Sequence, residues 1–160
     1  VTTTPSFSIA FHGFLRTGEG RITTFDVPGA EWTFALSNSI NPAGEIAGYY
    51  EEADNVFHGF LRARDGTFIT FDVPGAGTGA FQGTGGFEVA INPAGAITGT
   101  YVDSNSISHG FVRSANGTIT EFDPTGSVST NPASINPAEA ITGSYLDAND
   151  VSHGFLLEKH

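Results

Sequence analysis

The chain has 160 residues and a formal net charge of −11, from 17 acidic against 6 basic side chains. This charge argues against a nucleic-acid or anionic-membrane partner, because phosphate binding depends on clustered Lys and Arg. The absence of cysteine excludes disulfides and thiolate metal sites, and 21 Gly, 8 Pro and only 14% charged residues are typical of a secreted all-β protein.

Short motifs recur along the whole chain at nearly constant spacing. His-Gly-Phe occurs four times, and Phe-Asp begins thirteen residues after each of the first three histidines. The histidine spacings of 46, 51 and 44 residues indicate tandem supersecondary units that share a core with their neighbours. The four histidines are His12, His58, His109 and His153.

The first elements in chain order form a hairpin. After an extended lead-in over residues 1–8, two β-prone runs, Phe11–Arg16 and Arg21–Val27, surround the loop Thr17–Gly20. We label these two strands c and d. Copies of this hairpin follow at Phe57–Arg62 with Thr67–Val73, and at His109–Arg113 with Thr118–Phe122.

The c-d loop has four residues in each copy, which predicts the pairing of the two strands. Pairing about the loop centre places His58 opposite Phe71 on one face of the sheet. Asp72 is then expected to point to the other face.

A second hairpin, of strands a and b, lies between each d and the next c. Its turn Asn-Pro-Ala-Gly favours a type I geometry, and in the third copy Glu139 replaces the glycine, which predicts a different or strained turn. The a strands are Phe34–Ile40, Phe87–Ile91 and Ala133–Ile135, and the b strands are Ile46–Tyr50, Ile97–Tyr101 and Ile141–Tyr145.

The units therefore follow the order c-d, a-b-c-d, a-b-c-d, a-b-c within a single repeat domain, over residues 1–30, 31–76, 77–126 and 127–160. Four-stranded antiparallel repeats of this length are typical of β-propeller blades. We expect strand d at Arg21–Val27 to pair with the last strand c and close a ring of three blades. Two alternatives stay open: half-rings of two chains that join into a six-bladed propeller, and a β-trefoil.

The motifs His-Gly-Phe-Leu-Arg, Phe-Asp-Val-Pro-Gly-Ala and Ile-Asn-Pro-Ala-Gly resemble those of the bacterial extracellular repeat family named for its His-Ala-Phe motif. The resemblance spans roughly Phe11 to Leu156, although Gly stands in place of Ala in all four copies and Val-Pro-Gly is missing after Asp123. It implies secretion and a propeller-like fold, and it carries over no catalytic residues. Because methionine is absent even at position 1, we expect the numbered chain to begin after a processed leader or a cut boundary.

The repeated histidines are the first candidates for chemistry. Converging imidazoles bind a divalent metal or act as bases, whereas a histidine that faces an aromatic residue across a hairpin is typical of a buried structural role, which we favour. The enzyme alternative is a small promiscuous hydrolase of esters or phosphoesters. Its base would be His58 or His109, with Asp72 or Asp103 orienting that base or holding a metal.

The b-to-c connections carry a Tyr, an acid two residues later, and Asp or Asn two residues after that. Alternating oxygen ligands suit calcium or another divalent cation, although the same residues are ordinary turn formers. The candidate metal ligands are Glu52, Asp54, Asp103, Asn105, Asp147 and Asn149.

We expect the b-to-c and d-to-a loops to form one face on which aromatic rings stand beside carboxylates. Such a face suits a glycan or a cation. The leading hypothesis is a secreted binding module, a monomer or homodimer, with a small-molecule, glycan or protein ligand. The insertion Gly77–Gly86 is expected to be a flexible lid or contact loop. The expected ligand-binding residues are Trp32, Tyr50, Tyr101 and Tyr145.

Overall fold

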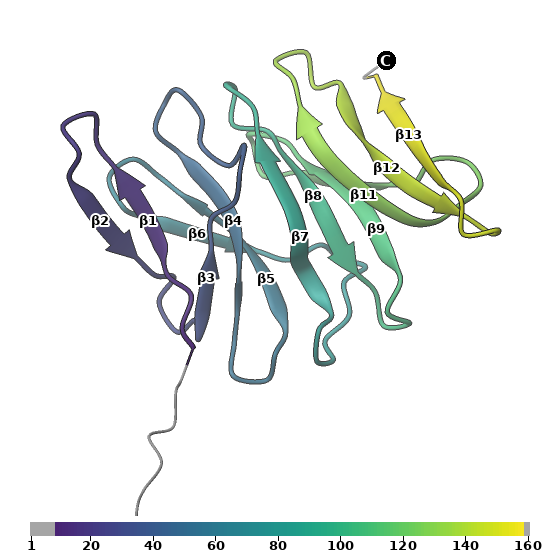
Figure 1. Cartoon of the computed structure of the whole chain (residues 1–160), viewed down its shortest axis with the longest axis horizontal. Helices are drawn as coiled ribbons and strands as arrows, with labels where there is room; N and C mark the ends of the chain where they lie inside the picture. Colours follow the sequence, from purple (N-terminus) through teal and green to yellow (C-terminus); the bar gives the residue numbers. More distant parts are fainter. Residues whose placement is uncertain (1–8, 159–160) are drawn as a thin grey trace, which may run out of the picture.

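The computed structural model describes residues 9–158, and this range contains thirteen strands and no helix (Figure 1). The expected all-β class is therefore confirmed. No helix that is long and apolar enough to cross a membrane occurs among these residues. The strands are β1 (Gly13–Arg16), β2 (Ile22–Phe25), β3 (Trp32–Phe34), β4 (Ile46–Glu51), β5 (Phe57–Arg62), β6 (Phe68–Phe71), β7 (Gly83–Ile91), β8 (Ile97–Val102), β9 (Ser108–Arg113), β10 (Ile119–Phe122), β11 (Ser127–Ile135), β12 (Ile141–Asp147) and β13 (Ser152–Leu157).

Neighbouring strands pair antiparallel in the order that the motifs indicate. The first unit is the hairpin β1-β2, the second is β3-β4-β5-β6, the third is β7-β8-β9-β10, and the fourth is β11-β12-β13. A single parallel bridge between Phe57 and Gly83 joins the second and third units into one eight-stranded sheet. The other two sheets have two and three strands.

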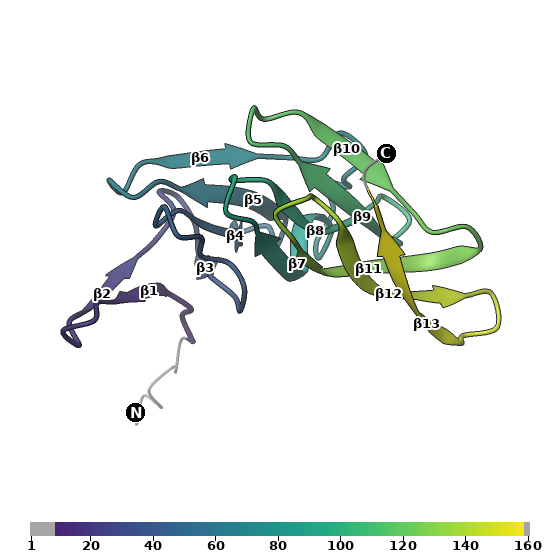
Figure 2. The same ribbon diagram turned by 90° about the horizontal axis from the view of Figure 1, so that it is seen from above.

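The expected closure of the ring within one chain is wrong. Among the described residues β2 pairs only with β1, and β13 pairs only with β12. The units follow one another in an open row, with β2 at one end and β13 at the other (Figures 1 and 2). The physical reason is that β2 is already engaged, since Phe25 and Leu15 pack against the second unit. The open row also lacks the closed barrel of a β-trefoil.

Hydrophobic cores lie between neighbouring units rather than inside them. Phe60 and Tyr50 of the second unit pack with Leu15 and Phe25 of the first. Phe111 of the third unit belongs to a cluster that includes Leu61 and Phe71 of the second, and Ile141 of the fourth packs with Val112 and Phe122 of the third. A single unit therefore buries little apolar surface without its neighbour, as in other repeat proteins.

The register of the c-d hairpins differs by one residue from the predicted one. Gly59, not His58, lies opposite Phe71, and Arg62 lies opposite Phe68. The loop is a three-residue turn: the amide of Ala63 donates to the carbonyl of Thr67, and Gly66 adopts a φ of 97°. A glycine in this left-handed conformation forms the bulge that usually follows such a turn. The shift brings His58 beside Asp72, which corrects the prediction that Asp72 points to the other face.

The same three-residue turn closes the a-b hairpins. Gly44 and Gly95 have φ values of 82° and 87°, and Glu139 has a φ of 61° with the same backbone hydrogen bonds. A residue with a side chain in this region carries strain of order 1 kcal/mol or more. The expected strained turn at Glu139 is therefore confirmed, and its geometry is shared with the other copies.

Phenylalanine rings of strand d lie directly over the glycines of strand c. A methyl group on Gly59 would lie 2.6 Å from carbon atoms of the Phe71 ring, and Gly13 and Gly110 have the same relation to Phe25 and Phe122. Only glycine permits this approach, which explains why the second residue of the first three His-Gly-Phe motifs has no side chain.

Replacement of Gly59 by Ala is expected to lower the free energy of unfolding by about 1–3 kcal/mol, because the Phe71 ring must move out of an inter-unit core. Urea denaturation followed by circular dichroism measures this change. Gly18→Ala is the matched control, since nothing lies within 4 Å of the added methyl group. Equal stabilities of the two variants would contradict the ring-over-glycine account.

Candidate functional site

The loops gather at two opposite ends of the strands, because successive strands run antiparallel. The b-c turns and the d-a connections lie together at one end, which we call the loop face. The c-d and a-b turns lie at the other end, which we call the hairpin face. Each strand c begins at the loop face with its histidine and ends at the hairpin face.

A pocket of about 270 Å³ opens on the loop face of the second unit. His58 and Asp72 form part of its wall, together with apolar residues such as Val73 and Pro74. His58 Nδ1 lies 2.9 Å from an Asp72 carboxylate oxygen. The Asp72 side chain is 57% exposed, so this carboxylate can meet a ligand.

The third unit has a pocket of the same volume, about 270 Å³, at the equivalent place. His109 and Asp123 line it, and His109 Nδ1 lies 2.7 Å from Asp123 Oδ2. Asp103 approaches the other ring nitrogen, Nε2, at 3.7 Å. The structure thus pairs His58 with Asp72 and places His109 between Asp103 and Asp123.

Buried side chains beneath each pocket fix the histidine and the aspartate. Tyr50 stacks on His58 and Tyr101 stacks on His109, each with ring centroids 5.1 Å apart. The buried Thr84 accepts a hydrogen bond of 2.8 Å from the amide of Val73, next to Asp72.

The aspartates of the first and third units have threonines at the same place, and each threonine comes from the next unit along the chain. Thr33 accepts from the amide of Val27, and Thr130 donates to Asp123. Sequence reasoning missed these threonines. Thr33 and Thr130 each follow their aspartate by seven residues, but the insertion before Thr84 hides the pattern.

The aromatic residues do not form the exposed set that the sequence indicated. Tyr50 and Tyr101 are only 7% and 5% exposed, because each lies under its histidine. Tyr145 is half-buried against His153, at 5.0 Å between ring centroids. Trp32 is half-buried on Phe11 and donates its indole N–H to the carbonyl of Ile9. Their role here is to support the loop face from below.

The candidate metal ligands lie in three separate b-c turns, and their oxygen atoms close those turns. Asp103 Oδ1 accepts from the amides of Asn105 and Ile107, at 2.8 Å each. Asp147 does the same for Asn149 and Val151, and Asp54 accepts from Val56. Glu52 begins the turn of the second unit. Within residues 9–158 no three His, Asp or Glu side chains are grouped so that they could hold a metal ion.

Hydrogen bonds and burial shift several pKa values at this face. Donation from the Ile107 amide lowers the pKa of Asp103, and the hydrogen bond to His153 lowers the pKa of Asp147 to about 2. Burial, followed by the hydrogen bond to Glu121, raises the pKa of Tyr101 well above its ordinary value. Asp103 and Asp147 therefore stay ionised at neutral pH, while the phenol of Tyr101 stays neutral.

The insertion in the d-a connection of the second unit is not a free lid. The amide of Gly77 donates to the carbonyl of Val102, and Gln82 Nε2 donates to the carbonyl of Ser104. On its other side Phe81 donates to Asn55 of the second unit. The insertion thus ties two b-c turns together and forms one edge of the pocket at His58.

No family model matches the chain, and no curated protein or solved structure was found to be similar to it. The relation to the His-Ala-Phe repeat family therefore stays a prediction from the motifs.

The raised pKa of Tyr101 has a consequence for stability at high pH. A group whose pKa is higher in the folded than in the unfolded state stabilises the fold fully below its unfolded pKa, about 10 for tyrosine, and this contribution is lost as the pH rises through the folded value. Tyr101→Phe should therefore be less stable than the parent at pH 8, and the difference should shrink above about pH 10. Urea denaturation at a series of pH values tests this, and a constant difference across the series would contradict it.

Proposed function

We infer that this protein is a binding module of the β-propeller type, and that its loop face takes a cationic ligand. The four-stranded units would be blades, and the two pockets beside His58 and His109 would be equivalent subsites. The secreted location that the motifs imply belongs to the same proposal. The observation that carries it is the repetition of one acidic pocket in two successive units.

The distribution of charge supports a cation over an anion or a neutral ligand. Within residues 9–158 the loop-face segments contain no Lys or Arg, while they carry acids in every unit, including Asp72 and Asp123. All the arginines of this range border the c-d loops on the hairpin face. They are Arg16, Arg21, Arg62, Arg64 and Arg113. A face of one sign attracts and orients ligands of the opposite sign.

The pockets supply the contacts that a basic side chain needs. The Asp72 and Asp123 carboxylates are 57% and 38% exposed, so each has surface free for an ammonium or guanidinium group. Apolar walls, Val73 and Pro74 in one pocket and Val128 in the other, suit the methylene stem of Lys or Arg. The buried Tyr50 and Tyr101 support the pockets and are too deep for sugar stacking.

The test is calorimetric titration with a hexalysine peptide, at low and at high ionic strength. Binding should weaken with salt, because the contacts are exposed charges. Asp72→Asn with Asp123→Asn is expected to weaken the affinity about tenfold. Asp65→Asn with Glu19→Gln is the control, since it removes the same charge from the hairpin face.

Three results would contradict the cationic ligand. An equal loss of hexalysine affinity in the two double variants would mean that only the net charge of the protein matters. A neutral oligosaccharide that binds on a glycan array, with no binding of hexalysine, would favour the glycan alternative. Calorimetric binding of calcium that Asp103→Asn abolishes would favour a metal at the b-c turns.

A second candidate function is a hydrolase of esters or phosphoesters, favoured by the geometry of His58. This histidine lines its pocket, and Asp72 holds Nδ1 in the way that a carboxylate orients a general base. Chromogenic esters and phosphoesters, assayed with and without a chelator, test this role. Activity should fall at least about a hundredfold in His58→Ala if this base is used. Activity that survives in both His58→Ala and His109→Ala would remove the assignment.

A further inference from the structure

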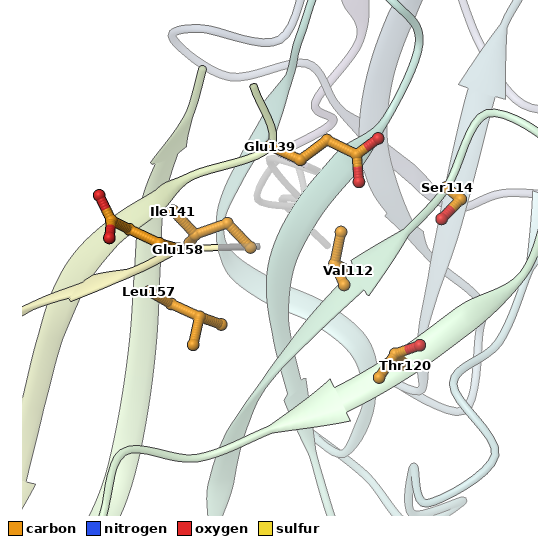
Figure 3. Close-up of a pocket in the computed structure, with 7 residues that line it drawn as sticks. All are labelled: Val112, Ser114, Thr120, Glu139, Ile141, Leu157 and Glu158. Carbon is orange, nitrogen blue, oxygen red and sulfur yellow. The ribbon is translucent and has the colours of Figure 1, made fainter. Parts of the chain in front are cut away.

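The fourth unit presents a free sheet edge beside uncovered apolar surface. β13 pairs with β12 on one side only, and Leu156 and Leu157 are 63% and 40% exposed. A pocket of about 240 Å³ lies beside this edge, with Val112 and Thr120 of the third unit on one side and Ile141 and Leu157 of the fourth on the other (Figure 3). A second hollow of about 120 Å³ is lined by Phe122, Phe155 and Leu157, among others.

The inner units show what covers such an edge. Strands β6 and β10 pair with the edges of β5 and β9. Phe68 of β6 packs its ring on both Phe25 and Phe60, across the boundary between two units. At the last boundary the rings equivalent to Phe25 and Phe60 are Phe122 of the third unit and Phe155 of the fourth, with centroids 6.0 Å apart. This pair has no strand d over it.

Gly154 gives a second, independent indication. Each earlier glycine of the His-Gly-Phe motif lies under a phenylalanine ring, whereas a methyl group on Gly154 would meet nothing closer than a backbone oxygen at 3.9 Å. The space above Gly154 is therefore large enough for a phenylalanine ring, and no ring of the same chain fills it. His153 likewise contacts Asp147 through Nε2 at 3.0 Å, and its Nδ1 lacks the strand-d aspartate that the other three histidines have.

We propose that strand β2 of a second copy of this chain pairs with the free edge of β13. By the register of β1 with β2, Phe25 of the second copy then covers Gly154, and Ile22 lies opposite Leu157. Asp26 follows Phe25 and lies beside His153. β2 thus carries, in chain order, the apolar side chain, the ring and the carboxylate that the edge of β13 lacks. Arg21 lies opposite Glu158, so that opposite charges meet.

β13 takes the place that β1 holds in the isolated chain, because both strands are copies of strand c. There β1 pairs on one side only, and its Phe14 is 63% exposed. β13 is longer, is backed by β12, and already packs Phe155 against Phe122. Leu156 replaces Leu15 in the core beside Phe60. Ile22, now 62% exposed, becomes buried.

The exchange is reciprocal, so that each of two copies gives β2 to the other. A two-fold arrangement of this kind closes on itself and pairs the free edge of β13 in both copies, while β1 of each copy is displaced from the ring. It contains the second, third and fourth units of both chains, which makes six units, within the usual range of about four to eight for a closed ring. This inference concerns assembly and stands independently of the proposed ligand.

The mass of the chain in solution, measured by sedimentation over a range of concentrations, tests the pairing. We expect twice the chain mass of 16.7 kDa for the parent. Gly154→Val should give the mass of one chain with unchanged circular dichroism, since the added side chain blocks the Phe25 ring and its Cβ meets no atom of its own chain closer than the Gly143 carbonyl oxygen, at 3.9 Å. Ser144→Val, on the adjacent strand and opposite Gly154, is the control and should behave as the parent. A parent of one-chain mass throughout, or a Gly154→Val dimer, would overturn the proposal.

Cysteine cross-linking identifies the partner strand directly. The chain has no cysteine, and Thr23 should lie opposite Leu156. A mixture of a Thr23→Cys chain and a Leu156→Cys chain should form a disulfide-linked pair with one of each. A disulfide that forms only inside single chains of the double variant would assign the edge to the chain's own β2 and overturn the second copy as occupant. No disulfide in either case would also overturn it.

Discussion

The contact of a phenylalanine ring with the glycine opposite it determines most of this structure. The ring of Phe71 can lie flat on strand c only because Gly59 has no side chain. That contact sets the hairpin register, and the register in turn places the histidine and the aspartate side by side at the loop face. The other side of the ring packs edge-on against Phe111, 6.0 Å away in the next unit. One side chain thus links register, site geometry and the packing of neighbours.

The same packing separates charge along the strands. Arg62 and Arg113 end their strands with guanidinium groups about 5 Å above the rings of Phe25 and Phe71. Arg113 is nearly buried there, and its Nε has no hydrogen-bond partner. These cations are therefore held at the hairpin face, far from the acids at the start of each strand. The asymmetry of the two faces follows from strand direction, because every repeat places the same residue at the same end.

The sequence was sufficient for features that depend on local pattern, and insufficient for those that depend on a single residue or on distant packing. Alternation and turn motifs predicted the order of strands from β1 to β13, and the missing glycine at Glu139 predicted a strained turn. The bulge at Gly66 shifts the pairing of strand d by one residue, so that Arg62 lies opposite Phe68, and this shift reverses the face of Asp72. The burial of Tyr50 depends on stacking with His58 across the b-c strand pair, a register that the motifs did not predict. Closure depended on whether the first hairpin was already bound elsewhere, which no local motif records.

The position of the cores between units, rather than inside them, bears on how such a chain grows during evolution. Each core is built from side chains of two neighbouring units. A duplicated segment of one full repeat therefore completes the core with the unit before it and presents the same apolar surface to the unit after it. The three-residue turns at Gly66 and Gly95 recur in the other c-d and a-b hairpins. Recombination between copies therefore keeps the strand order and the pairing register at the junction. A duplication of part of a period would instead leave one apolar surface without its complement. Duplications that keep every core complete therefore add whole repeats.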